Sequence, residues 1–364
     1  MEYDVIFRNG NIYGGGMYLQ KNVDMAIKDG EIVKIDKHIE GTAPTELDIR
    51  GKMVSAAFVD SVYCAIEEAE RIIRMCLAKG TTTIKYHIPF DETWEEAALE
   101  KAVALKEKYK DKVTLLCVVP YTSDNARKWE EAAKKGWVDF IGTRPNEKDT
   151  KVLDTIFQLA QTYDLPIDIT VDNADEPDIE TFLYVIEKTV EERLQGRVTC
   201  NHVTALDAEG MDPITAGIAV AKCARARVNV VSMTSEDIFT SNWERRGATK
   251  VRDLLDAGVS VSIASGNIQN EIRPFGNGNP LEEALLTAQV HKFTTHAEFS
   301  RVYEMLTYNP AENTLLEKYG TNIGYRADLI VVDAPNTTEA ILDKADINYV
   351  FKCGKMVAKD GAIL

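Results

Sequence analysis

Over most of its length the chain alternates short β-rich runs with amphipathic helical stretches, and this unit occurs eight times. Polar, helix-forming segments such as DETWEEAALEKAVALKEKY (91–109) and PDIETFLYVIEKTVEERL (177–194) separate the runs. Strands that alternate with helices form parallel sheets, and eight such units close into a (β/α)8 TIM barrel. The sequence therefore predicts an α/β protein with a barrel over residues 51–323 and strands at 53–60, 81–88, 113–119, 138–142, 165–171, 197–203, 228–233 and 259–264.

The two ends of the chain depart from this alternation. Residues 1–50 contain short β-rich runs with an Asp-Gly turn at 29–30, and similar runs return in residues 324–364, with the turn KCGK at 352–355. Such turns between β-branched runs are typical of hairpins. We therefore expect both ends to pair into one small β-sandwich domain, 1–50 plus 324–364, beside the barrel.

The overall charge restricts the classes of partner. The chain has 364 residues, a formal net charge of −16 and an isoelectric point near 4.9. Nucleic acids and anionic membrane surfaces need clustered positive charge, so we expect neither as a partner. The sequence shows no secretory signal and no apolar run that would span a bilayer, and its six cysteines form no CxxC pair. These features predict a cytoplasmic protein with free thiols.

Histidines limit the metal chemistry that the barrel can support. The chain has five histidines, and only His87 and His202 end predicted barrel strands. Catalytic groups of such barrels lie at the carboxyl ends of the strands. A hydrolytic zinc or iron site needs about three protein ligands and an open position for water. Asp172 or Asp60 could join the two histidines, but no tight metal-binding motif is present.

Several stretches nevertheless resemble the amidohydrolase superfamily, and within it the cytosine-deaminase branch. The two β-rich ends resemble its composite sandwich, and the likeness extends over nearly the whole chain in conserved order. The internal stretches that carry it are LAKGTTTIKYH (77–87), LAQTYDLPIDI (159–169), RVTCNHVTAL (197–206), WERRGATKVRDLLDAGVSV (243–261) and RPFGNGNPLEEAL (273–285). The resemblance implies a barrel hydrolase that acts on non-peptide C–N bonds of a small heterocycle, with zinc or iron as the usual metal.

The resemblance also implies a set of metal and proton-transfer residues, and this chain differs at most of those positions. A His-x-His pair and a later histidine correspond to Val62, Cys64 and Thr170. The general-acid glutamate and the strand-8 aspartate correspond to Asn173 and Gly266, whereas His202 keeps the family residue. Val62 and Gly266 offer no ligand or base. We therefore expect no metal cofactor and no metal-dependent deaminase activity.

The remaining polar groups at strand ends are the candidate site. His202, Asp172 and Cys64 are the catalytic candidates, because an imidazole beside a carboxylate or a thiolate is a workable acid, base or nucleophile. The candidates for ligand binding are Lys85, His87, Arg144, Thr170, Asn173, Trp243 and Asn267.

Three functions stay open at this point. The protein is a metal-independent hydrolase, or a catalytically inactive pseudoenzyme that binds a small ligand or a partner subunit, or an enzyme whose metal is held by His87, His202, Cys64 and Asp172. The expected ligand is a small heterocycle, by resemblance, and a homo-oligomer is among the assembly states left open.

Overall fold

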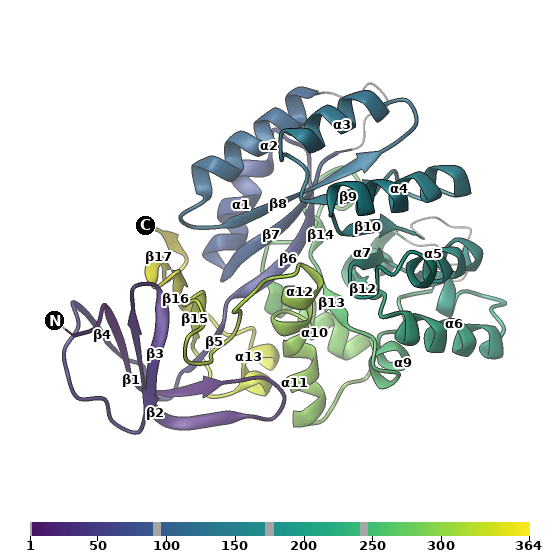
Figure 1. The fold of residues 1–364 in the computed structure, drawn as a ribbon. Coiled ribbons are helices and arrows are strands. Elements are labelled where there is room, and N and C mark those ends of the chain that lie inside the picture. The colour runs from purple at the N-terminus through teal and green to yellow at the C-terminus, as the bar shows by residue number, and fades with distance from the viewer. Residues whose placement is uncertain (1, 90–95, 172–177, 241–246) are drawn as a thin grey trace.

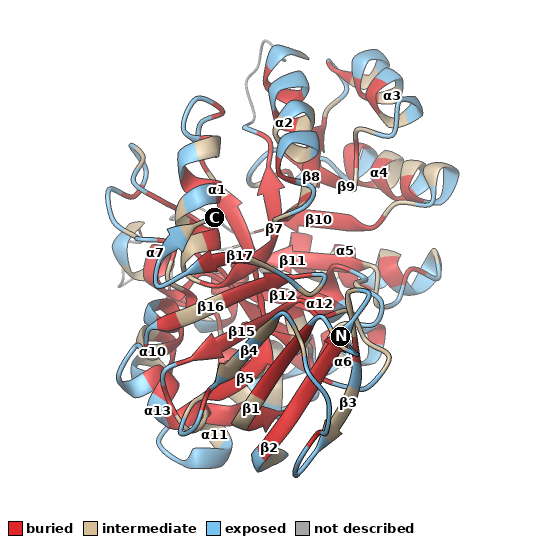
Figure 2. Ribbon diagram, turned by 90° about the vertical axis from the view of Figure 1, so that its left-hand side faces the viewer, coloured by how far each residue is buried: buried red, intermediate tan, exposed pale blue. Residues whose placement is uncertain are grey.

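The computed structural model describes residues 2–89, 96–171, 178–240 and 247–364. A curled parallel sheet with helices on its outer side adjoins a second sheet, and both chain termini lie beside that second sheet (Figure 1). The strands of the parallel sheet are buried almost throughout, whereas the helices expose their outer faces (Figure 2). Among the described residues, no helix combines the length and the apolar character needed to cross a bilayer.

The parallel sheet has the order β13-β12-β11-β10-β9-β8-β7-β6-β14. Its strands are β6 (Phe58–Tyr63), β7 (Thr81–His87), β8 (Thr114–Tyr121), β9 (Phe140–Thr143), β10 (Ile167–Thr170), β11 (Val198–Asn201), β12 (Asn229–Ser232), β13 (Val261–Ile263) and β14 (Gly266–Asn267). This order confirms the predicted α/β class with a parallel, curled sheet. The last strand segment, β14, pairs with the first strand, β6.

Helices follow the strands along the chain. They are α1 (Ala69–Ala78), α2 (Glu96–Tyr109), α3 (Ala126–Lys134), α4 (Thr150–Tyr163), α5 (Ile179–Glu191), the 3-10 helix η1 (Thr204–Asp207), α6 (Pro213–Ala226), α7 (Thr234–Thr240), α9 (Val251–Asp256), α10 (Pro280–Val290), α11 (His296–Glu304), α12 (Tyr308–Asn313) and α13 (Thr337–Leu342). Several begin at a capping side chain: Asp149, Asp212 and Asn279 accept hydrogen bonds from the first turns of α4, α6 and α10. Such caps contribute about 1 kcal/mol each.

The second sheet combines strands from both ends of the chain. Its order is β18-β17-β16-β15-β5-β1-β2-β3, and β4 pairs with β1. The strands are β1 (Val5–Tyr13), β2 (Leu19–Lys28), β3 (Glu31–Asp36), β4 (Thr45–Asp48), β5 (Met53–Ala56), β15 (Leu329–Val332), β16 (Ile347–Lys352), β17 (Lys355–Lys359) and β18 (Ala362–Ile363). The pairing of β5 with both β1 and β15 joins the two ends.

The predicted first barrel strand, 53–60, is in fact shared between the two sheets. Met53–Ala56 pairs in the second sheet, and after Ala57 the chain enters the parallel sheet as β6. The prediction of one strand was wrong because MVSAAFVD is apolar at six of its eight positions, and such a run has no periodicity that would mark a change of sheet.

A buried ion pair connects the two sheets. The Lys352 ammonium, on β16, donates to Asp328 Oδ2 at 2.7 Å and to the Thr82 carbonyl of β7 at 3.2 Å. Asp328 Oδ1 accepts from the Cys353 backbone N–H at 2.7 Å. Both charged side chains are only 4% exposed. The more exposed Arg326 guanidinium also donates to Asp328 Oδ2 at 3.0 Å, so Lys352 is the main but not the sole cation that compensates Asp328.

We expect Lys352→Met to lower the free energy of unfolding by about 3 kcal/mol, because it leaves the Asp328 carboxylate buried without its ammonium. Urea unfolding followed by circular dichroism measures this change. The control is Lys318→Met, which removes an exposed pair with Glu31 at 3.4 Å and should move the midpoint little. Equal shifts for both variants would show that the buried pair does not stabilise the protein.

Candidate functional site

A cavity of about 600 Å³ opens at the carboxyl ends of the parallel strands. Its polar lining consists mainly of Tyr63, His87, Asp168, Thr170, His202, Glu236 and Asn267. Its apolar lining includes Ile88, Val118, Pro120, Pro145, Ile268 and Ile272. A volume of this size and a wall of this kind are typical of small-molecule sites.

A buried ion pair lies at the floor of this cavity. Asp168 on β10 accepts hydrogen bonds from the Lys85 ammonium of β7 and from the Asn201 side chain of β11. The Lys85 and Asp168 side chains are 2% and 0% exposed. Burial alone would raise the pKa of Asp168, but the adjacent Lys85 ammonium holds it below its ordinary value. Asp168 is therefore an ionised acceptor whose charge is already compensated.

Tyr63 and His87 form the next layer above this floor. Their rings stack with centroids 3.9 Å apart and an interplanar angle of 19°. The Tyr63 hydroxyl lies 3.2 Å from Asn201 Nδ2 and 3.4 Å from Thr170 Oγ1. His87 Nε2 is 3.8 Å from Asp168 Oδ1 and has no hydrogen-bond partner among the described residues. Burial lowers the pKa of His87 to about 3, so its imidazole is neutral.

The opposite wall carries a second polar network. His202 Nδ1 is 2.7 Å from Asp237 Oδ1, and His202 Nε2 is 4.0 Å from Glu236 Oε1. Glu236 accepts from the backbone N–H and the side-chain amide of Asn267, each at 2.8 Å. The amide oxygen of Asn267 accepts from Asn270 Nδ2 at 2.6 Å. Glu236 and Asn267 thus face the cavity as a hydrogen-bonded pair, with His202 beside them.

His202 reaches the cavity through an unusual backbone conformation. Its φ is 70°, and φ of the following Val203 is 54°, both in the left-handed region that few β-strand residues adopt. Strand alternation therefore ends at Asn201. Cys200, two residues before His202, is buried in the apolar layer and does not line the cavity.

Cys64 lies in the cavity wall, but its thiol is a poor nucleophile. Burial raises its pKa to about 12, so the reactive thiolate is scarce at neutral pH.

The other predicted residues have different fates. Thr170 and Asn267 line the cavity as expected. Lys85 lies beneath the floor of the cavity and does not line it. Arg144 does not line the cavity either, and its guanidinium pairs with the Glu147 carboxylate at 2.7 Å. Asp172, Asn173 and Trp243 lie outside the described residues.

Val62 does not face the cavity. It is paired with Tyr86, and both belong to the apolar layer that also contains Ile72 of α1. Its neighbour Tyr63, which pairs with His87, points inward instead. The sequence analysis missed Tyr63 and Asn201. The register of His87 with Tyr63 could have identified the former, because parallel neighbours in register share a face.

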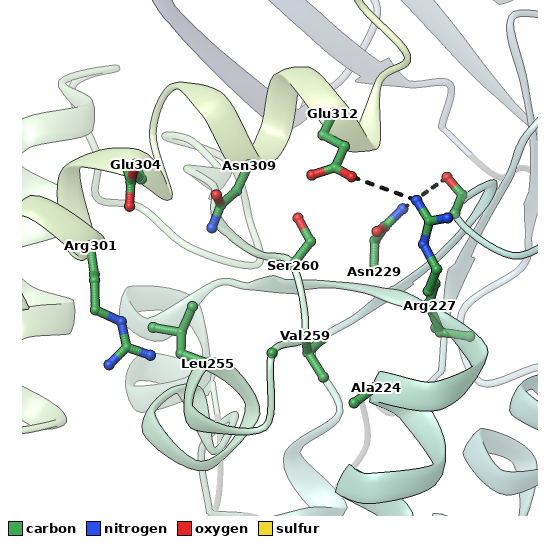
Figure 3. Close-up of a pocket in the computed structure, with 13 residues that line it drawn as sticks. Ala224, Arg227, Asn229, Leu255, Val259, Ser260, Arg301, Glu304, Asn309 and Glu312 are labelled. Atoms are coloured by element: carbon green, nitrogen blue, oxygen red, sulfur yellow. Dashed lines mark hydrogen bonds and ion pairs between the residues drawn. The ribbon is translucent and has the colours of Figure 1, made fainter. Parts of the chain in front are cut away.

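A smaller pocket of about 310 Å³ lies at the other end of the strands, where β12 and β13 begin (Figure 3). It contains none of the predicted site residues. Arg227 is 3.9 Å from Glu312, and Asn229 donates to the Gly196 carbonyl at 3.4 Å. Functional sites of such folds lie at the carboxyl ends of the strands, so the larger cavity is favoured as the functional site.

Comparison with known proteins identifies the family. A family model described as the amidohydrolase family matches residues 38–361. The chain belongs to the amidohydrolase family. A relative in Pseudomonas sp. (strain ADP), N-isopropylammelide isopropyl amidohydrolase, is 26% identical over 100% of this chain and 99% of its own length.

Solved amidohydrolase structures share the fold. A 5-methylcytosine deaminase from Klebsiella pneumoniae superposes with a TM-score of 0.85, 21% identity and 97% coverage of each chain. An N-isopropylammelide isopropylaminohydrolase from Burkholderia multivorans ATCC 17616 gives a TM-score of 0.85, 20% identity and 100% coverage of each chain. These identities bear on the fold alone.

The described residues of this amidohydrolase do not fit a zinc or iron ion. No group of three or more His, Cys, Asp or Glu that could hold a metal occurs within 2–89, 96–171, 178–240 and 247–364. Asp168 is bonded to Lys85 and Asn201, and His202 is bonded to Asp237. One prediction is a metal held by His87, His202, Cys64 and Asp172, and it stays a prediction because Asp172 lies outside the described residues. The alteration of the family's metal and proton-transfer positions also stays a prediction.

We expect brief alkylation of the native protein with iodoacetamide at pH 7.5 to spare Cys64, because burial keeps its thiol protonated. Cys353, which is exposed, should be labelled instead. Peptide mass spectrometry locates the label, and the denatured protein serves as the control in which all six cysteines react. Rapid labelling of Cys64 in the native protein would contradict this expectation and would make Cys64 a candidate nucleophile again.

The neutral His87 makes stability depend on pH. Its pKa is about 3 in the folded chain against an ordinary value of 6.5, so the unfolded state binds more protons between these values. The contribution of the neutral His87 imidazole to the free energy of unfolding is complete above pH 6.5 and is lost as the pH falls toward 3. Between pH 7 and 4.5 the wild type should lose about 2 kcal/mol more unfolding free energy than His87→Asn. Parallel pH profiles from urea unfolding would show that His87 titrates normally.

Proposed function

We propose that the cavity binds a small polar nitrogen heterocycle, and that the protein performs no metal-activated hydrolysis. The observation that carries the proposal is the orphaned nitrogen of His87. His87 lines the cavity, its side chain is 8% exposed and its ring is neutral, and its buried Nε2 has no partner among the described residues. A buried polar atom left unpaired costs about 1–3 kcal/mol, which a polar ligand edge would recover.

The rest of the cavity supports a ligand of this class. Its apolar wall suits a flat ring, and its polar floor and His202 network offer several hydrogen-bonding groups at fixed positions. The relatives named above are named for N-isopropylammelide and 5-methylcytosine, which are nitrogen heterocycles with amino substituents.

The charge arrangement supports the absence of metal-activated water. A hydrolytic metal needs several anionic or imidazole ligands around an open position. Here the Lys85 ammonium already compensates the charge of Asp168, so this carboxylate offers a metal cation little net attraction.

A second candidate is hydrolysis without a metal, and the His202–Asp237 contact of 2.7 Å favours it. A carboxylate on one imidazole nitrogen fixes the tautomer and leaves the other nitrogen for proton transfer. His202 would then be the general base, in agreement with its place among the catalytic candidates. If no substrate is turned over, the protein is a ligand-binding pseudoenzyme.

We also propose the finer architecture expected from the sequence, a closed (β/α)8 barrel beside a terminal β-sandwich. Only Ala264 and Ser265 separate β13, which pairs with β12, from β14, which pairs with β6. The net charge of −16 supports a protein without nucleic-acid or membrane partners.

The test uses full-length protein purified without chelator or added metal. We expect substoichiometric zinc and iron by elemental analysis, binding of at least one amino- or oxo-substituted pyrimidine or triazine by isothermal titration calorimetry, and weaker binding by His87→Phe. An ammonia-release assay with the same compounds, with and without chelator, separates the two candidates: release that survives chelation and is lost in His202→Ala supports metal-independent hydrolysis. Stoichiometric metal with chelator-sensitive turnover would overturn the proposal.

A further inference from the structure

Gly266 leaves a space that the side chain of Glu236 fills. Its φ is +61°, and a Cβ added to it would lie 2.3 Å from Glu236 Oε2 and 3.0 Å from Met233 Sδ. Real Cβ atoms do not approach another atom so closely, so any side chain at 266 would displace the Glu236 carboxylate. A carboxylate supplied by the start of α7 therefore stands beside the backbone of β14.

Two hydrogen bonds fix the Glu236 carboxylate in this position. Oε2 accepts from the Asn267 backbone N–H and Oε1 from the Asn267 side-chain amide, both at 2.8 Å. Each carboxylate oxygen has two lone pairs, so each can accept one more hydrogen. The distance of 4.0 Å from Oε1 to His202 Nε2 is too long for a hydrogen bond between them.

The remaining acceptor capacity is directed at the ligand cavity. Glu236 lines the cavity, yet the residue is only 1% exposed. Hydrogen bonds made by a charged group in such a place are strong, and a ligand carbonyl placed against it would be repelled. The carboxylate thus distinguishes ligand edges that donate hydrogens from edges that accept them.

We propose that Glu236 is the specificity-determining residue of the cavity, and that it selects heterocycles that present an exocyclic amino group over their oxo counterparts. Gly266 is required because it leaves room for the carboxylate. This inference rests on the proposed function, since it names the ligand edge that the same cavity recognises.

The test compares matched amino and oxo ligands by isothermal titration calorimetry: cytosine against uracil, and melamine against cyanuric acid. We expect the wild type to bind the amino member of a pair at least about tenfold more tightly. Glu236→Gln should reduce this preference to about twofold or reverse it, because the amide replaces one acceptor by a donor.

Gly266→Ala tests the same carboxylate without removing it. It should weaken binding of the amino ligand about tenfold, since the new methyl group displaces Glu236. The matched control is Gly136→Ala: Gly136 has φ +71° and no atom within 4 Å of its added Cβ, so this variant carries the backbone strain alone and should bind as the wild type does. Circular dichroism and urea midpoints verify folding of each variant.

The outcomes separate the two proposals. If the wild type binds these heterocycles without an amino preference, or if Glu236→Gln keeps that preference, the role of Glu236 is wrong and the proposed function stands. If the wild type binds none of the four compounds, both proposals fail. Should Glu236→Gln not fold, the wild-type preference and the Gly266→Ala and Gly136→Ala pair still decide the question.

Discussion

The Lys85–Asp168 ion pair is the contact on which the arrangement of the cavity depends. It joins β7 to β10 across the inside of the curled sheet, with both side chains buried. Two opposite charges removed from water must stay together, because either one alone would cost several kcal/mol. Asp168 in turn accepts a hydrogen bond from the Asn201 side-chain amide, and the same amide group donates to the Tyr63 hydroxyl. The floor of the cavity is therefore a neutral, internally bonded surface.

Membership of the amidohydrolase family does not by itself determine the chemistry of this molecule. The amidohydrolase fold extends over the chain, yet the described strand ends hold an ammonium, a neutral imidazole and a carboxylate bonded to an amide. Fold alone does not determine a reaction, which depends on the side chains placed at the site. The described strand ends of this chain supply polar side chains that hydrogen bonds hold at fixed positions.

Much of the fold follows from the sequence, because a strand and a helix differ in the period of their apolar residues. The parallel strands from β7 to β12 lie close to their predicted positions. Periodicity could not show that 53–60 changes sheet at Ala57, since both halves are apolar. Periodicity also could not predict the direction of every side chain at the site. His87, Thr170 and Asn267 were found because regular alternation holds to the strand ends, whereas the positive φ of His202 breaks it. The role of Glu236 depends on an approach to Gly266 from a different element, and no local pattern encodes such a contact.

The hydrogen bond from Lys352 to the Thr82 carbonyl has a consequence for the order of folding. It connects residues 270 positions apart, and β7, which accepts it, also carries Lys85 and His87. During synthesis the barrel strand emerges from the ribosome long before β16 does, at rates of about 5–20 residues per second. For that interval β7 lacks one of its native partners. This contact of β7 is therefore completed only after the carboxyl-terminal strands have been made, which links a strand of the cavity wall to completion of the second sheet.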